Sequence, residues 1–294
     1  MIITRLRGGL GNQLFQYACG RAISLRTNNP MKLDVAGYIQ ASAQSTETRR
    51  NYSLSYFAID ERVATDDEIR RLKYPFGIIS KGWRFFKIKI LRQFNVGFNA
   101  HQMRRLTRAK NLYLDGFWQS EKCFEDRADT IRQEIKLKKP MCPAAADVAA
   151  QIKKNAHGGI RNISIHVRRG DVQIGGDGND YYGICTPAYY ARAFACAATT
   201  NAHVFVFSDE PEWVRANISI PYPATFVSGK NISDCEELIL MSMCSTNIIA
   251  NSTFSWWGAW LNTNHDKIVI APTEWAVRGK KQHIHTVPPS WIRL

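Results

Sequence analysis

The first 35 residues contain a short apolar segment, a glycine-rich loop, a helical pattern and a second apolar segment. Residues 1–6 form the first apolar segment, and Gly8-Gly9-Leu10-Gly11 follows it. Residues 12–25 carry apolar side chains at the spacing of a helix, and residues 31–35 form the second apolar segment. A strand, a helix and a second strand in this order make the unit of a parallel sheet. The chain is therefore expected to adopt an α/β fold.

The second half of the chain repeats this alternation. Strands are expected at residues 163–167, 204–207, 224–227, 247–250 and 268–270, and helices at 187–198, 209–216, 233–243 and 255–262. This rhythm predicts a doubly wound α/β domain. The lysine- and proline-rich residues 138–143 separate two helical patterns. A chain of 294 residues suits two domains, which we expect at residues 1–140 and 141–294.

The charge balance favours anionic partners. The chain has 39 lysines and arginines against 25 acidic residues, a net charge of +14, and such a surplus attracts nucleic acids, acidic membranes or phosphorylated substrates. Residues 81–110 hold nine basic residues and no acidic one, with aromatic residues between them. This segment suits contact with an anionic membrane surface, and equally a solvated basic surface over an apolar core. Its pattern fits both helix and strand.

The cysteines and the N-terminus bear on the cell compartment. The seven cysteines are dispersed and form no C-x-x-C pair, which favours reduced thiols packed as small apolar residues. No apolar run is long enough for a membrane span, and the first residues lack the apolar core of a signal peptide. We expect a cytoplasmic protein, either soluble or peripheral on the inner face of the cell membrane. The histidines and carboxylates show no metal-ligand spacing, so no metal or other cofactor is expected.

The glycine loop near the start has two interpretations. Glycines between a strand and a helix allow a ligand to approach the backbone, and the helix N-terminus favours an anion. Gly9 and Gly11 partly match a dinucleotide fingerprint, and Asp34 stands where a ribose-binding acid would be. Leu14, however, occupies the position of the third glycine. A purely structural turn explains the loop equally well.

A second motif, His166-Val167-Arg168-Arg169-Gly170-Asp171, follows a predicted strand. Open α/β sheets bind ligands beyond the carboxyl ends of their strands. Two guanidinium groups there can hold phosphate oxygens bidentately. The alternative is a surface arginine pair that bridges to a nearby acid.

Two further motifs follow later strands. Asp209 can accept hydrogen bonds from a nucleobase or ribose, or can cap the next helix. Ser252, Thr253 and Ser255 can form an anion cradle at a helix start, or an ordinary hydroxyl N-cap. The adjacent Trp256-Trp257 pair is better explained by packing than by stacking on a sugar.

The four motifs together resemble the α-1,2-fucosyltransferases of glycosyltransferase family 11. The resemblance covers roughly residues 1–275. It implies a GT-B-type fold, in which two Rossmann-like doubly wound domains face each other across a cleft. The N-terminal domain would lie on the acceptor side, and the C-terminal domain would bind GDP-fucose. It also implies inverting, metal-independent transfer of L-fucose from GDP-β-L-fucose to the 2-hydroxyl of a galactose. The acceptor would be a galactose-terminated oligosaccharide, lipid-linked or part of a surface polysaccharide.

The resemblance also implies roles for single residues. Arg168 matches the arginine that contacts the β-phosphate, and Arg169 would orient the motif or meet the second phosphate. The other matches are His166 and Asp209 for the guanine end, Ser252, Thr253 and Ser255 for a second phosphate-contacting turn, and Asn12 with Gly9 and Gly11 for the loop facing the reaction centre. The general base stays open among Asp171, Asp177 and Asp180.

Three alternatives remain at this stage. Gly9, Gly11 and Asp34 would suit a nicotinamide-dependent oxidoreductase, although the later motifs are then unexplained. The net charge would suit a nucleic-acid-binding protein, but no known motif supports nucleic acid as a partner. A fucosyltransferase of another linkage, such as α-1,3, or of another acceptor would share the donor motifs.

Overall fold

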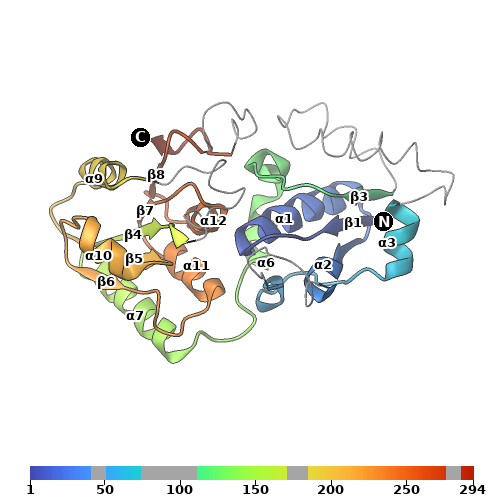
Figure 1. Ribbon diagram of the computed structural model, residues 1–294, viewed down its shortest axis with the longest axis horizontal. Coiled ribbons are helices and arrows are strands. Elements are labelled where there is room, and N and C mark those ends of the chain that lie inside the picture. Colours follow the sequence, from blue (N-terminus) through green and yellow to red (C-terminus); the bar gives the residue numbers. More distant parts are fainter. Residues whose placement is uncertain (41–50, 74–110, 171–184, 276–285) are drawn as a thin grey trace. The chain divides into compact units, whose positions relative to one another are not determined.

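The computed structural model describes residues 1–40, 51–73, 111–170, 185–275 and 286–294 (Figure 1). The basic segment 81–110 and the candidate bases Asp171, Asp177 and Asp180 lie outside these residues. The chain divides into two compact units, Met1–Lys136 with Lys281–Thr286, and Leu137–Lys280 with Val287–Leu294. The sequence placed the division after Pro140.

The first unit is built on a three-stranded parallel sheet. Its strands are β1 (Ile2–Arg5), β2 (Met31–Asp34) and β3 (Leu112–Leu114), in the order β2-β1-β3. Its helices are α1 (Leu10–Thr27), α2 (Ala36–Gln40), α3 (Asp66–Lys73) and α6 (Ala128–Glu134), and the 3-10 turns Leu54–Tyr56, Glu121–Cys123 and Glu125–Arg127 lie between them. The predicted β1, α1 and β2 are present. The three-residue β3 was not predicted, because so short a segment shows no period.

The helix α1 approaches β1 very closely. A Cβ atom at Gly20 would lie 2.1 Å from Thr4 Oγ1, so only glycine permits this approach. Most side chains of the helix are buried, including Leu14 and Phe15. The close helix–strand packing that a dinucleotide fingerprint assigns to its third glycine is thus provided here by Gly20.

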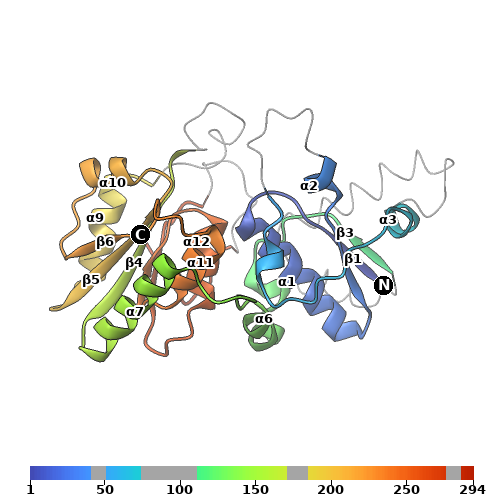
Figure 2. The ribbon, with the colours of Figure 1, turned by 90° about the horizontal axis from the view of Figure 1, so that it is seen from below.

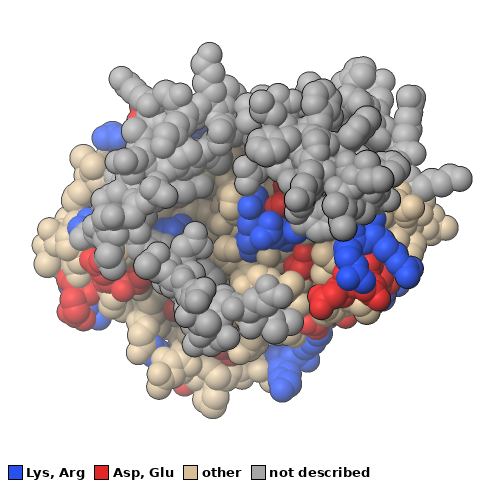
Figure 3. Space-filling view, turned by 45° about the vertical axis from the view of Figure 1, so that its right-hand side comes forward, with Lys and Arg blue, Asp and Glu red and all other residues tan. Residues whose placement is uncertain are grey.

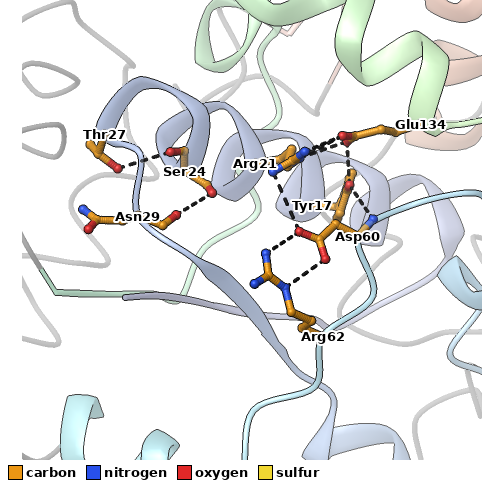
Figure 4. A network of polar contacts seen from close by, with 8 residues as sticks. All are labelled: Tyr17, Arg21, Ser24, Thr27, Asn29, Asp60, Arg62 and Glu134. Carbon is orange, nitrogen blue, oxygen red and sulfur yellow. Dashed lines mark hydrogen bonds and ion pairs between the residues drawn. The ribbon is translucent and has the colours of Figure 1, made fainter.

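A network of charged and polar side chains joins α1 to the rest of this unit (Figure 4). The carboxylate of Glu134 accepts hydrogen bonds from Tyr17 Oη at 2.6 Å and from Arg21 Nη2 at 2.7 Å. Arg21 also lies 3.9 Å from Asp60, which pairs with Arg62 at 2.5 Å. The hydrogen bonds that Arg21 donates to Glu134 are the main cause of the raised pKa of Arg21. Because both partners of the Arg21–Glu134 pair are mostly buried, the pair needs its complete set of contacts.

The second unit contains a six-stranded sheet. Its strands are β4 (Arg161–Val167), β5 (Ala202–Ser208), β6 (Ala224–Phe226), β7 (Thr246–Ile248), β8 (Ile268–Ala271) and β9 (Ile292–Arg293). Their order is β6-β5-β4-β7-β8-β9, and every pair is parallel. The helices are α7 (Pro143–His157), α9 (Pro187–Cys196), α10 (Pro211–Asn217), α11 (Asp234–Ser242) and α12 (Thr253–Leu261). This order is that of a doubly wound Rossmann-like sheet, as predicted.

Helices cover both faces of this sheet (Figure 2). On one face, apolar side chains such as Ile163, Ile165 and Val204 pack with α9 and α10. On the other face, α11 packs against both α7 and α12. Trp256 and Trp257 of α12 are completely buried and lie edge to face, with ring centroids 5.2 Å apart. The tryptophan pair is therefore part of the core, which confirms the packing interpretation.

The described surface mixes charges of both signs. Figure 3 shows basic side chains beside acidic ones on the face that it draws, and ion pairs such as Lys32–Glu68 and Arg70–Asp67 occur in the first unit. Within the described ranges, no helix is both long and apolar enough to cross a membrane. All seven cysteines fall inside those ranges, and none forms a disulfide there.

The Glu134 network predicts a stability effect. Replacing Glu134 by Ala leaves the Arg21 guanidinium and the Tyr17 hydroxyl without their shared acceptor, which is expected to lower the free energy of unfolding by about 2–3 kcal/mol. Glu134→Gln keeps an acceptor oxygen and should lose clearly less. Urea denaturation followed by circular dichroism measures both variants. Equal stability of Glu134→Ala and the wild-type protein would show that the network contributes nothing.

Candidate functional site

The second unit has a topological switch point between β4 and β7. From β4 the chain continues to β5 and β6 on one side, whereas β7, β8 and β9 follow on the other. The loops that leave the carboxyl ends of β4 and β7 therefore diverge, and open α/β sheets bind ligands in the crevice that results. The arginine motif follows β4, and the Ser252–Thr253 turn follows β7.

The structure brings these two predicted motifs together. Arg168 Nη1 lies 3.5 Å from Ser252 Oγ, although the residues are 84 positions apart. Ser252 is the N-cap of α12, and its hydroxyl accepts the N–H of Phe254 at 3.3 Å. The guanidinium group thus lies beside the N-terminus of a nine-residue helix. Both features favour a negative charge.

The other two residues of this turn are placed differently. Ser255 is completely buried, and its hydroxyl donates to the backbone oxygen of Ser252 at 3.4 Å. Thr253 is the first residue of α12. The turn therefore forms the hydroxyl N-cap that the sequence offers as an alternative. The backbone N–H groups of the first turn of α12 lie at the switch point between β4 and β7. Capping and anion binding are compatible in such a turn.

Asp209 holds the loop after β4. Its carboxylate accepts the N–H groups of Arg169 at 3.0 Å and of Gly170 at 2.9 Å. The capping alternative is wrong, because the residue at the N-cap of α10 is Glu210. Asp209 therefore acts on the arginine motif across neighbouring strands, a contact that β4–β5 pairing makes possible.

The two arginines have different surroundings. The Arg169 guanidinium stacks on Trp213, with Cζ 3.5 Å from the ring centroid, and its Nε lies 3.4 Å from Glu210 Oε2. Its side chain is only 16% exposed. Arg169 thus forms the bridge to an acid that the sequence offered as an alternative, whereas Arg168 is directed toward Ser252. These contacts favour an orienting role for Arg169.

His166 is the last side chain of β4 but one, and it is mostly buried. Its ring centroid lies 5.4 Å from that of Phe254, and its backbone oxygen accepts a hydrogen bond from Tyr190 at 3.1 Å. The ring therefore sits between the end of β4 and the first turn of α12. This position places it next to the Arg168–Ser252 contact.

A buried carboxyl group at the same sheet edge was not predicted. Glu237 of α11 is 8% exposed, and burial raises its pKa to about 7, against a hydrogen bond from Ser228 that lowers it. Ser228 Oγ accepts the N–H of Ser208, the last residue of β5, at 3.0 Å. Near neutral pH this carboxyl is partly protonated and can both donate and accept hydrogen bonds. No local pattern in the sequence indicates that Glu237 is buried.

The glycine loop lies in the first unit, at the carboxyl end of β1. Gly8 has φ +79°, and a Cβ there would lie 2.7 Å from Asn12 Nδ2. Gly9 is the N-cap of α1 and leaves room for a Cβ, and Gly11 is buried in the first turn. The position that requires glycine is therefore Gly8. Asn12 Oδ1 accepts a hydrogen bond from Gln119 Nε2 at 2.9 Å.

Asp34 is engaged within this unit. Its carboxylate accepts hydrogen bonds from Tyr113 Oη at 2.5 Å and from the N–H of Ala36 at 3.1 Å, and it is buried. A ribose-binding acid needs lone pairs directed at a ligand. These contacts weaken the oxidoreductase interpretation. In the described part of the chain, no three histidine, cysteine or carboxylate side chains cluster as metal ligands would.

Comparison with known proteins identifies glycosyltransferases as relatives of this chain. A family model described as "Glycosyl transferase family 11" matches residues 78–294. An alpha-1,2-colitosyltransferase from Escherichia coli is 30% identical over 308 residues, covering 100% of this chain and 99% of that protein. A galactoside 2-alpha-L-fucosyltransferase from Caenorhabditis elegans is 28% identical over 200 residues, covering 64% of this chain and 54% of that protein.

A solved structure supports the fold. A mutant of Arabidopsis thaliana FUT1 in complex with GDP matches with a TM-score of 0.51 at 12% identity, over 89% of this chain and 68% of that chain. Together with the parallel sheets and helices of the two units, this likeness confirms the predicted α/β fold of the GT-B type.

The raised pKa of Glu237 predicts a pH effect on stability. The unfolded chain loses this proton near the ordinary value of 4.5 and the folded chain near 7, so the folded state binds more protons between these values. The free energy of unfolding should therefore fall as pH rises through this window, by about 3 kcal/mol at 1.36 kcal/mol per pKa unit. Glu237→Gln should remove this fall.

The measurement is urea denaturation at intervals between pH 5 and 8 for the wild-type protein and two variants. Glu212→Gln is the matched control, since the Glu212 side chain is 86% exposed. It should keep the wild-type slope. The same slope in Glu237→Gln would show that Glu237 is ionised throughout the range.

Proposed function

The chain belongs to glycosyltransferase family 11, and on that premise we propose that it transfers L-fucose from GDP-β-L-fucose to the 2-hydroxyl of a galactose residue in a glycan. The observation that carries this proposal is the Arg168 guanidinium beside Ser252, at the switch point between β4 and β7. A nucleoside diphosphate-sugar presents two phosphates to such a site. A guanidinium group and a helix N-terminus are suitable partners for both.

The reaction creates charge where these groups lie. The acceptor oxygen attacks the anomeric carbon of fucose from the face opposite the diphosphate, and its proton must go to a base. The bond between the anomeric carbon and the phosphate oxygen breaks, and GDP leaves with the electron pair. In this proposal Arg168 and the N–H groups at the start of α12 stabilise the negative charge that develops on the β-phosphate. The configuration at the anomeric carbon is inverted.

Metal independence is part of the same proposal. Many transferases neutralise a departing diphosphate with a divalent cation, whereas here a fixed guanidinium group would take that role. Arg169 supports it indirectly, because its stacking on Trp213 and its pair with Glu210 fix the loop that carries Arg168. The base stays a choice among Asp171, Asp177 and Asp180, which lie outside the described residues.

The nucleoside would bind along the neighbouring strand ends. The resemblance assigns His166 and Asp209 to the guanine end. The structure adds Glu237, whose carboxyl is connected through Ser228 to the end of β5. Both carboxylate oxygens of Asp209 already accept loop N–H groups, and we propose that Glu237 supplies an additional acceptor for the guanine end.

The similarity to a colitosyltransferase supports a second candidate donor, GDP-colitose. The alpha-1,2-colitosyltransferase is 30% identical over the whole chain, and colitose differs from fucose by the loss of the 3-hydroxyl. Both sugars would leave the same diphosphate, so the Arg168 argument does not separate them. Initial rates with GDP-fucose and GDP-colitose at equal concentration decide between the two donors.

The proposed function extends to the acceptor and to a membrane surface. A galactose-terminated oligosaccharide, lipid-linked or part of a surface polysaccharide, suits the family resemblance. Contact of residues 81–110 with anionic lipid would bring the enzyme to such an acceptor. That segment lies outside the described residues, and its role is for vesicle-binding experiments to decide.

The donor proposal is tested first by calorimetric titration with GDP in the presence of EDTA. GTP, UDP and NAD⁺ serve as controls. Selective binding of GDP without a metal ion is the expected result. Binding only with a divalent cation would contradict metal independence, and binding of NAD⁺ without GDP would favour the oxidoreductase alternative.

Replacing Arg168 by Ala tests the diphosphate clamp. Turnover with GDP-fucose should fall by about 10²–10³-fold, because a group aimed at the leaving charge is lost, while the thermal midpoint stays near that of the wild-type protein. Arg161→Ala is the matched control, since Arg161 begins the same strand at its opposite end. Near-normal turnover in Arg168→Ala would show that the clamp is misassigned.

A further inference from the structure

The strands β4 and β7 separate where the loops of the proposed donor site begin. Their pairing ends at Ile165 opposite Ile248. Beyond this pair one chain segment continues to Arg168, and the other continues to Ser252 and the N-terminus of α12. The distance between the guanidinium group and the helix N-terminus therefore depends on how far the two segments diverge over a few positions. Contacts that fix this divergence also fix the geometry of the site.

Two adjacent tyrosines of α9 hold both segments just beyond the last pair. Tyr190 Oη donates to the backbone oxygen of His166 at 3.1 Å. Tyr189 Oη donates to the backbone oxygen of Ile249 at 2.7 Å and lies 3.3 Å from that of Ile270 in β8. His166 and Ile249 are the residues that directly follow the last β4–β7 pair. One helix therefore provides a hydroxyl to each strand at the position where the strands separate.

The tyrosine pair is itself fixed in the core. Tyr189 and Tyr190 are 4% and 0% exposed, and their rings lie edge to face with centroids 5.0 Å apart. Burial raises the pKa of both hydroxyls, so both stay protonated and can donate. The N-cap hydroxyl of Thr186 accepts the N–H of Tyr189 at 3.4 Å, which fixes the first turn of α9. Because a buried hydroxyl without a partner is costly, the pair favours one separation of the two strands.

A further contact connects the start of α9 to the turn after β7. Burial raises the pKa of the Cys185 thiol to about 11, so the thiol stays protonated near neutral pH. Its Sγ donates to Asn251 Oδ1 at 3.6 Å, and it is also hydrogen-bonded to Tyr190. Asn251 directly precedes Ser252, the N-cap of α12. The beginning of α9 thus contacts the chain on both sides of the switch point.

We propose that Tyr189 and Tyr190 are positioning residues of the donor site, which hold the loops after β4 and β7 at the separation that lets Arg168 and the N-terminus of α12 bind one diphosphate together. This inference rests on the proposed function, because it takes the diphosphate of the donor as the ligand. Each hydroxyl binds a backbone oxygen, so its effect on the ligand is transmitted through the loop. A preordered loop leaves less ordering for the ligand to impose.

The ratio of the dissociation constants of GMP and GDP measures how much the β-phosphate contributes to binding. Isothermal titration in EDTA gives this ratio for the wild-type protein, Tyr189→Phe and Tyr190→Phe. We expect the ratio to fall by about three- to tenfold in each variant, the equivalent of one hydrogen bond. Phenylalanine retains the ring and its packing, so both variants should fold.

A double variant tests whether the tyrosine acts through Arg168. Arg168→Ala alone should lower the ratio, and adding Tyr190→Phe to it should lower the ratio little further, because the two changes then affect one interaction. Full additivity of the two effects would overturn the positioning role.

Tyr222→Phe is the matched control. The Tyr222 hydroxyl also donates to a backbone oxygen, that of Thr199, at 3.1 Å. These two residues directly precede β6 and β5, at the amino ends of the strands and away from the switch point. Thermal midpoints are recorded for all variants. Tyr222→Phe should lose stability as the other tyrosine variants do and keep the wild-type ratio. The same pattern in Tyr189→Phe and Tyr190→Phe would reduce the pair to a structural role and overturn the inference.

Failure of this inference is distinguishable from failure of the proposed function. If Arg168→Ala lowers the ratio and both tyrosine variants keep it, the positioning role is wrong and the diphosphate clamp stands. If Arg168→Ala keeps the wild-type ratio, or if the wild-type protein does not prefer GDP to GMP, the clamp itself is misassigned and the positioning role is wrong with it.

Discussion

The parallel pairing of β4 with both β5 and β7 is the constraint on which the second unit depends. It brings the ends of three strands to one edge, so residues 168–170, Asp209 and Ser252 become neighbours. A buried polar cluster secures the pairing, because Asn247 Nδ2 donates to Ser164 Oγ at 2.7 Å and Asn262 Nδ2 donates to Asn247 Oδ1 at 2.8 Å. Such satisfied contacts fix the register of a core more specifically than apolar packing alone.

The same physical arrangement occurs with different side chains in the two units. Each sheet has a switch point where two loops diverge, and in each a side chain from one loop contacts the other. In the second unit that contact involves Arg168 and a helix N-terminus, which suit a diphosphate. In the first, Asp115 after β3 pairs with Arg5 and Arg7, and Gln119 donates a hydrogen bond to Asn12 in the first turn of α1. The charge balance of the two edges therefore differs, so the same arrangement of loops need not serve the same ligand chemistry.

The sequence was sufficient for features with a local signal. The period of residues 12–25 predicted α1, and the Ser233–Glu236 spacing is the capping box that begins α11. Contacts between distant residues had no such signal. The stacking of Arg169 on Trp213 joins positions 44 apart in number only because β4 and β5 pair, and the raised pKa of Glu237 follows from burial that only the assembled helices create. The three residues of β3 are too few for a period, so this strand was not predicted.

The contrast between Arg168 and Arg169 shows why two adjacent arginines are useful. A flexible arginine side chain loses rotamer entropy when it is held in one geometry. Arg169 is already fixed by Trp213 and Glu210, and the loop backbone is fixed by Asp209. These contacts order the loop before a ligand arrives, so in the proposed function less entropy would be lost when Arg168 binds a phosphate. The second arginine therefore contributes to preorganisation, and its charge is balanced by Glu210 and does not compete for the same anion.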